Sequence, residues 1–219
     1  MRRASCNIET NGLSRVVGYY EGWAPQRPCN AIYPEQIPLG VYTHLNFAFA
    51  SIDPKSFEVV PMTSRDPQLY DRLTSLKYYD PDLKVNIAIG GWSFNSPGPT
   101  ARTFSDLAAS EDNQRKFFKS LISFMSTYGF DGVDIDWEYP GASERSGRPE
   151  DFANFPRFIA NLKNALRGTN GRDELSITLP ASYLYLQHFD LERLSDHVDY
   201  FNIMTYDLHG AWDRGELAI

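Results

Sequence analysis

The chain has 219 residues, of which 42% are hydrophobic and 14% aromatic, with a formal net charge of −7 and a pI near 5.1. This length and apolar content suit one globular domain with a sizeable core. The acidic balance and the lack of a Lys/Arg run argue against a nucleic-acid partner, and no stretch approaches the roughly 18 consecutive apolar residues that span a membrane.

The amino end does not carry the apolar segment of a secretory signal, which taken literally indicates a cytosolic protein. We expect residues 1–14 to form an N-terminal extension and residues 15–219 to form one domain. Cys6 and Cys29 are either two unrelated thiols or a disulfide that ties down the amino end. Two cysteines are too few for a Cys-rich zinc module.

Apolar runs alternate with amphipathic segments along the chain. The runs that predict strands are residues 15–20, 43–50, 84–89, 130–138, 175–180 and 198–207. The clearest helical patterns cover residues 112–128, ended by Gly129, and 152–166, closed by Gly168, with weaker patterns at 66–79 and 191–194. Two apolar stripes should face the core: Phe117, Phe118, Leu121, Ile122, Phe124 and Met125 in one, and Phe152, Phe155, Phe158, Ile159, Leu162 and Leu166 in the other.

Repeated strand and helix units predict a parallel α/β sheet, either doubly wound or closed as a barrel. A doubly wound sheet favours a phosphate-binding loop, and Gly90-Gly91 lacks the spacing of a dinucleotide fingerprint. A (β/α) barrel places functional side chains at the carboxyl ends of its strands, where Gly91-Trp92, Glu138 and Tyr206-Asp207 occur. The sequence therefore favours a barrel, incomplete here with about six βα units.

Three acids recur at every second position of the fourth predicted strand. Asp134, Asp136 and Glu138 alternate with apolar residues and so share one face. An exposed strand with a solvated acidic face is the ordinary explanation. Because the other predicted strands are apolar on both faces, we expect these acids to point inward, where unpartnered carboxylates cost several kcal/mol. Three such groups on one face indicate a chemical use.

The spacing of the acids predicts coupled titration. Alternate strand residues rise by about 6.5–7 Å, so the carboxyl groups can interact, and at least one pKa must rise. A carboxylic acid that stays protonated near neutral pH can serve as a general acid. Glu138 is the best candidate because it comes last, just before the Pro140-Gly141 turn. Asp131 is out of phase with the three and is interpreted as structural support at the start of the strand.

Several separate segments resemble glycoside hydrolase family 18, the chitinase-like (β/α)8 barrels. The resemblance runs from Arg15 to about Trp212. The matching segments are Val17–Trp23, Asn46–Phe49, Ala88–Trp92, Asp131–Glu138 and Met204–Asp207, with Ala88 at the serine position of the family's S-x-G-G motif. The segments 19–21 and 27–29 look most like the fungal class V enzymes.

The resemblance implies an endo-acting chitinase that cleaves β-1,4 bonds between N-acetylglucosamines by a substrate-assisted, retaining route without metal or cofactor. Glu138 would protonate the glycosidic oxygen, Asp136 would orient the substrate acetamide, and Asp134 beneath it would share a proton. Tyr206 would donate a hydrogen bond to the acetamide carbonyl. The substrate-binding residues implied are Tyr19, Phe49, Gly91, Trp92, Tyr139, Met204, Asp207 and Trp212, with Trp92 and Trp212 as stacking platforms.

The strand count departs from the family, whose barrel has eight strands. We therefore expect a partial chain, truncated at the C-terminus, from a monomeric extracellular parent, and expect this fragment alone to be poorly stable and weakly active. Two alternatives stay open: an inactive chitin-binding lectin on the same barrel, and an endo-β-N-acetylglucosaminidase acting on N-glycans. Retention of Glu138 argues against the lectin, and the aromatic-rich strand ends favour chitin.

Overall fold

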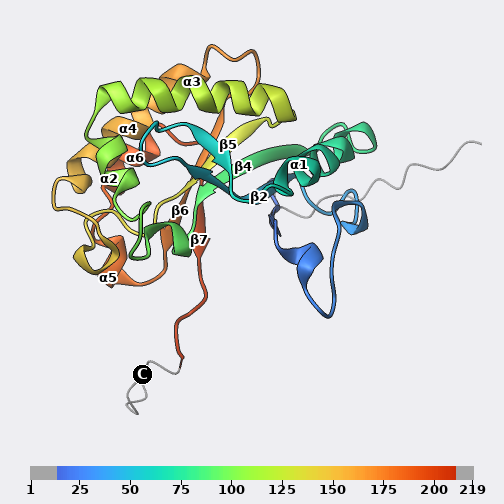
Figure 1. Cartoon of the computed structure of the whole chain (residues 1–219), viewed down its shortest axis with the longest axis horizontal. Coiled ribbons are helices and arrows are strands. Elements are labelled where there is room, and N and C mark those ends of the chain that lie inside the picture. The colour runs from blue at the N-terminus through green and yellow to red at the C-terminus, as the bar shows by residue number, and fades with distance from the viewer. Residues whose placement is uncertain (1–13, 211–219) are drawn as a thin grey trace, which may run out of the picture.

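The computed structural model describes residues 14–210, and its centre is a curled, mainly parallel sheet (Figure 1). Its parallel strands, in spatial order, are β1 (Val17–Glu21), β2 (His44–Ile52), β4 (Lys84–Gly90), β5 (Gly132–Asp136), β6 (Glu174–Pro180) and β7 (Tyr200–Met204). A short strand, β3 (Val59–Pro61), pairs antiparallel with β2. Six neighbouring parallel strands in sequence order form a half-barrel, as the alternation of strands and helices predicts.

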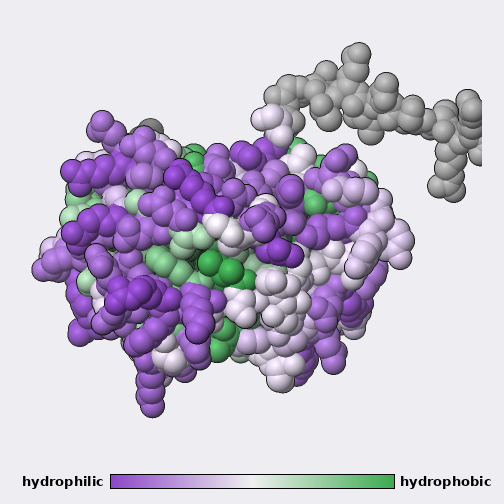
Figure 2. Space-filling view, turned by 90° about the horizontal axis from the view of Figure 1, so that it is seen from above, coloured by the Kyte–Doolittle hydropathy of each residue, from purple (hydrophilic) through white to green (hydrophobic). Residues whose placement is uncertain are grey.

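Helices connect successive strands and pack around the sheet. They are α1 (Asp66–Thr74), α2 (Thr103–Ala108), α3 (Glu111–Tyr128), α4 (Asp151–Leu166), α5 (Tyr183–Leu186) and α6 (Leu191–Ser195). Short 3-10 turns are η1 (Ala24–Gln26), η2 (Pro34–Gln36), η3 (Ser75–Tyr78), η4 (Trp92–Asn95) and η5 (Ser143–Arg145). Seen from above, the surface is largely hydrophilic around a central hydrophobic patch (Figure 2). No helix within residues 14–210 combines the length and apolar character needed to cross a membrane.

Helix α3 has the boundaries that its sequence predicts. The Ser110 hydroxyl caps its amino end by accepting from the backbone N–H of Asn113. Gly129 ends it in the left-handed region, at φ 76°, where glycine carries no steric penalty, and its N–H donates to the carbonyl of Met125. The predicted apolar stripe faces the core, with Phe117 and Leu121 fully buried.

Helix α4 differs from its prediction at both ends. Phe152, in the first turn, is 43% exposed. The rest of that stripe, from Phe155 to Leu166, is buried. The helix ends with Arg167 in helical conformation as its cap, so Gly168 does not provide the predicted closure. A 3.6-residue repeat identifies the buried face better than it identifies the terminal turns.

Several other boundaries differ from the sequence prediction. The helix expected at 66–79 consists of α1 followed by the 3-10 turn η3, whereas the pattern at 191–194 does form α6. β3, α2 and α5 are too short to show a repeat and were not predicted. β5 ends at Asp136, two residues before Glu138. The sequence predicts strands that are apolar and buried on both faces, but β7 is not, since Ile203 is 58% exposed.

Asp131 supports the start of β5, as its position out of phase predicts. Both carboxylate oxygens lie 2.9 Å from the ammonium of Lys77, and one accepts the backbone N–H of Val85 at 2.9 Å. The carboxylate thus joins the segment after α1, the start of β4 and the entry to β5. Its contacts serve the sheet and lie apart from the acids at the carboxyl ends.

Replacing Asp131 with Ala is expected to lower the free energy of unfolding by about 1–3 kcal/mol, because it leaves a partly buried amide and ammonium without their acceptor. Urea unfolding followed by circular dichroism measures the change. Asp112→Ala is the control, since its ion pair with Arg115 is exposed and worth less than about 1 kcal/mol. Equal losses in the two variants would contradict this role of Asp131.

Candidate active site

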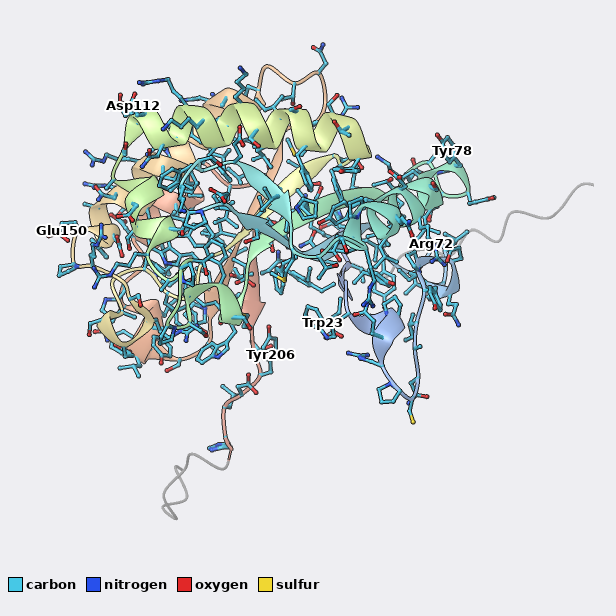
Figure 3. All side chains as sticks on the ribbon, in the orientation of Figure 1. Trp23, Arg72, Tyr78, Asp112, Glu150 and Tyr206 are labelled. Carbon is cyan, nitrogen blue, oxygen red and sulfur yellow. The ribbon has the colours of Figure 1, made fainter. Side chains whose placement is uncertain are left out.

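The carboxyl ends of the strands surround a cavity of about 370 Å³. The side chains that line it include Tyr19, Trp23, Phe49, Asp136, Met204 and Tyr206. Trp23 follows β1 and Tyr206 follows β7, and both lie on the lower side of the view in Figure 3. Five of these six residues are among those predicted from the sequence. Trp23, which stacks on Phe49 with ring centroids 6.3 Å apart, is not among the predicted binding residues, although it follows a strand end as Trp92 does.

Asp134 is completely buried in the middle of the sheet and is surrounded by donors. Its carboxylate accepts the hydroxyls of Tyr19 and Ser176, each at 2.6 Å, and the side-chain amide of Asn202 at 3.0 Å. Its register partners are Ala88 on β4 and Ser176 on β6. Alanine at position 88 offers no hydroxyl, so the serine donor comes from the other neighbouring strand.

The pKa of Asp134 is subject to opposing effects. Burial raises the pKa of this carboxyl, while the hydrogen bonds from Ser176, Tyr19 and Asn202 lower it. The donors reduce the cost of an anion at this depth. Asp134 is therefore a buried acid whose charge is stabilised by donors from three other strands, β1, β6 and β7, rather than by a cation.

Asp136 lies one step nearer the cavity and has fewer donors. It accepts a short hydrogen bond from the hydroxyl of Thr178. Burial, followed by the nearby charges of Glu138 and Asp134, raises the pKa of Asp136 well above its ordinary value. The three carboxyl groups thus interact electrostatically, as their spacing predicts.

Glu138 is buried, with 7% of its surface exposed, although it lies beyond the end of β5. Burial raises the pKa of its carboxyl, the neighbouring Tyr139 hydroxyl and Arg145 guanidinium oppose that rise, and the Asp207 carboxylate adds to it. A glutamate of this kind stays protonated at a higher pH than an exposed one. The pKa values of both Glu138 and Asp136 are raised, so the column can hold protons at a pH at which exposed carboxyl groups are ionised.

Two loop residues, missed in the sequence, fix the peptide groups of Glu138. Its backbone N–H donates to the side-chain oxygen of buried Asn95 at 3.3 Å, and its carbonyl accepts Nε of Arg145 at 3.1 Å. Asn95 belongs to η4 and Arg145 to η5. Neither lies in a periodic element, so hydrophobic patterning carries no signal for them.

Trp92 begins η4 directly after Gly91 and is 54% exposed. Gly91 has φ 85°, and a Cβ there would lie 2.8 Å from the ring of Phe49, so glycine is required for the turn that presents Trp92. The guanidinium of Arg145 lies 3.6 Å from the centre of a Trp92 ring. One face of the indole is thus occupied by a cation within the protein.

The remaining predicted residues fall into distinct places. Tyr139 is buried and stacks on Tyr185 at 4.2 Å between ring centroids. Tyr206 lines the cavity and is 63% exposed, and its pKa is raised by burial and by Asp136 and the other nearby carboxylates. Asp207, at φ 53°, adopts a left-handed conformation.

Two sequence predictions cannot be placed. Trp212 and Cys6 lie outside the described residues, and Cys29, which is described, is exposed. Within the described part of the chain, no cluster of three or more His, Cys, Asp or Glu side chains is arranged to hold a metal ion.

The sequence of residues 15–218 matches the family model of Glycosyl hydrolases family 18. The chain belongs to this family. Its half-barrel is accordingly an incomplete (β/α)8 barrel.

Individual members of family 18 resemble the chain along most of its length. It is 39% identical to the probable chitinase LysM18 of Penicillium expansum over an alignment of 201 residues, and this alignment covers 90% of this chain and 13% of that protein. The chain is 35% identical over 205 residues to the secreted chitinase LysM12 of the same organism, and this alignment covers 92% of this chain and 13% of that protein. Catalytic domain 2 of the Group II chitinase of Ostrinia furnacalis matches with a TM-score of 0.82 at 30% identity, covering 91% of this chain and 52% of that one. The chain thus spans about half or less of these relatives.

Proposed function

We propose that the chain carries the catalytic centre of a chitinase, a retaining glycosidase that cleaves β-1,4 bonds between N-acetylglucosamine units. The observation that carries the proposal is the column of three buried carboxyl groups that ends at Glu138, whose pKa is raised by burial, and of which Asp136 lines the cavity. The chitinases among its relatives support this substrate.

In this mechanism Glu138 gives its proton to the glycosidic oxygen while the bond from that oxygen to the sugar C1 breaks. The acetamide oxygen of the same sugar forms a new bond to C1, which yields a cyclic oxazolinium ion. Asp136, once it has passed its proton to Asp134 beneath it, is ionised and stabilises the positive nitrogen. Water then attacks C1 and gives a proton back to Glu138, so that the product keeps its original configuration.

The other proposed residues bind and orient the sugar. Tyr206 donates a hydrogen bond to the acetamide oxygen and Asp207 contacts the distorted ring, both from the segment after β7. Trp92 stacks on a sugar beside the acid, and Tyr19, Phe49, Gly91, Tyr139 and Met204 complete the pocket. Restricting the acetamide to one orientation is the entropic part of the rate enhancement.

The proposal extends to further features of the whole protein. An extracellular location follows from similarity to a secreted chitinase. We also propose that residues 15–219 form the catalytic unit, that residues 1–14 lie outside it, and that the protein is monomeric. Binding of chitin oligosaccharides accompanies the proposed hydrolysis.

Three substrates test the proposal: an N-acetylglucosamine pentamer, the fully deacetylated pentamer and a high-mannose glycopeptide. We expect cleavage of the first alone, because the second has no acetamide nucleophile. Mass spectrometry of the products measures each reaction. Cleavage of the glycopeptide would support the endo-β-N-acetylglucosaminidase, binding of the acetylated pentamer without cleavage would support the lectin, and cleavage of the deacetylated pentamer would contradict substrate assistance.

A further inference from the structure

Arg145 makes an unusual set of contacts between two parts of the proposed site. Its Nη2 donates to the backbone carbonyl of Trp92 at 2.5 Å, and its guanidinium lies 3.6 Å from the centre of a Trp92 ring. Its Nε donates to the carbonyl of Glu138 at 3.1 Å. One side chain thus contacts both the exposed indole and the peptide of the buried acid.

Within residues 14–210, no ion pair offsets the charge of Arg145. The residue is 7% exposed, and the ion pairs formed within residues 14–210 do not include it. Buried cations are normally paired because their desolvation costs several kcal/mol. Here the partners are two carbonyl oxygens and an aromatic face, which stabilise the cation without neutralising it. Its field therefore still acts on the surrounding groups.

The loop that carries Arg145 is folded tightly against itself. A Cβ at Gly147 would lie 2.6 Å from the backbone nitrogen of Ala142, and Gly147 donates to the Ala142 carbonyl at 2.8 Å. The carboxylate of Asp151, at the start of α4, accepts the backbone N–H groups of Gly141 and Arg148 at 3.2 and 2.7 Å. These contacts fix the loop on both sides of η5, so the place of Arg145 is determined by the backbone.

We propose that Arg145 is a positioning residue that holds the Trp92 ring and the Glu138 peptide in one arrangement and keeps a positive charge beside the acid. Nothing in the proposed chemistry requires it to touch substrate. It sets the distance between a sugar stacked on Trp92 and the proton donor, and it favours the ionised form that Glu138 takes after donating its proton. The inference rests on the proposed function for its consequences in catalysis.

The electrostatic consequence has a definite sign. The Arg145 cation lowers the pKa of Glu138 against the rise that burial causes. Removing the cation should move the pKa of Glu138 upward. The other titratable groups that act around Glu138 are Asp134 and Asp136 on β5, Tyr139 directly after Glu138, and Tyr206 and Asp207 in the segment after β7. None of these is changed by a substitution at position 145.

The test compares Arg145→Gln, Arg145→Lys and the matched control Arg148→Gln. Arg148 lies in the same loop, but its guanidinium pairs with Asp106 at 2.8 Å, away from Trp92. Carbon-13 NMR of carboxyl-labelled glutamate follows the titration of Glu138, with Glu138→Gln to assign its signal. We expect the signal to titrate at higher pH in Arg145→Gln and at the wild-type pH in Arg148→Gln.

A second measurement separates positioning from charge. Arg145→Lys keeps the cation but loses the planar contact with the indole, so Glu138 should titrate as in the wild type while the acetylated pentamer binds roughly fivefold more weakly. The alkaline limb of the pH profile for pentamer cleavage should move up in Arg145→Gln alone.

Each outcome is decisive for one of the two proposals. Unchanged titration of Glu138 in Arg145→Gln, or an equal shift in Arg148→Gln, would overturn the role of Arg145. If circular dichroism shows that Arg145→Gln does not fold, wild-type pentamer affinity in Arg145→Lys would overturn it instead. A shifted titration in a protein that cleaves no pentamer would contradict the proposed function and leave the role of Arg145 standing.

Discussion

Replacing Glu138 with Gln is expected to lower kcat/KM for the acetylated pentamer by about 10²- to 10⁴-fold, the range in which a general acid contributes. The amide has nearly the shape of the acid but no proton to give to the departing oxygen. Its backbone contacts with Asn95 and Arg145 do not involve the side chain, so the peptide should stay in place. Initial rates of pentamer cleavage measure the loss, and thermal unfolding checks that the fold is kept.

The pH dependence of activity is a second measure of the proton on Glu138. Because the active form of Glu138 is protonated, and burial raises its pKa, wild-type activity should persist above the pH at which an exposed glutamate ionises and fall as pH rises through the raised pKa. The residual activity of Glu138→Gln should lack this alkaline limb.

A matched substitution distinguishes this effect from the loss of any carboxylate. Glu58 is exposed in the turn between β2 and β3, outside the column of buried acids, so Glu58→Gln should keep both the rate and the alkaline limb. Wild-type rates in Glu138→Gln would remove Glu138 from the proposed role. A comparable loss in Glu58→Gln would show that the assay responds to net charge instead.

Alternation along one strand explains how much of the site the sequence could predict. Asp134 and Asp136 share a face because β5 is regular over both, and the apolar residues between them are buried against the helices. The half-barrel follows from the same logic, since six apolar runs separated by helical segments pair in chain order. Local periodicity is sufficient for both inferences.

Contacts made by loops could not be predicted from the sequence in this way. Glu138 is buried although β5 has ended, and what fixes it is Asn95 and Arg145, which approach from other turns. Such contacts depend on where two loops meet, which no single-segment pattern encodes. Phe152 illustrates the converse: it fits the apolar repeat of α4, yet it is 43% exposed.

Trp137 provides the largest expected effect on stability. It lies between Asp136 and Glu138 and points away from them into the core, where it is 1% exposed. Its ring stacks on Phe104 with centroids 5.4 Å apart and meets the ring of Phe155 edge-on at 5.1 Å. This residue therefore joins the acid-bearing segment to α2 and α4.

Trp137→Ala is expected to lower the free energy of unfolding by about 3–5 kcal/mol, because it removes the largest buried side chain of this contact and leaves a cavity that packed neighbours fill incompletely. Urea unfolding followed by circular dichroism measures the loss. The control is Tyr78→Ala, an aromatic residue that is 87% exposed and projects from the far side of the molecule from Tyr206 (Figure 3), where the change should stay within about 0.5 kcal/mol. A loss in Trp137→Ala no greater than in the control would contradict the packing described here. Because the same cavity frees the backbone that carries Asp136 and Glu138, the folded fraction of Trp137→Ala should also cleave the pentamer more slowly than wild type, which links the core of the half-barrel to the geometry of its acids.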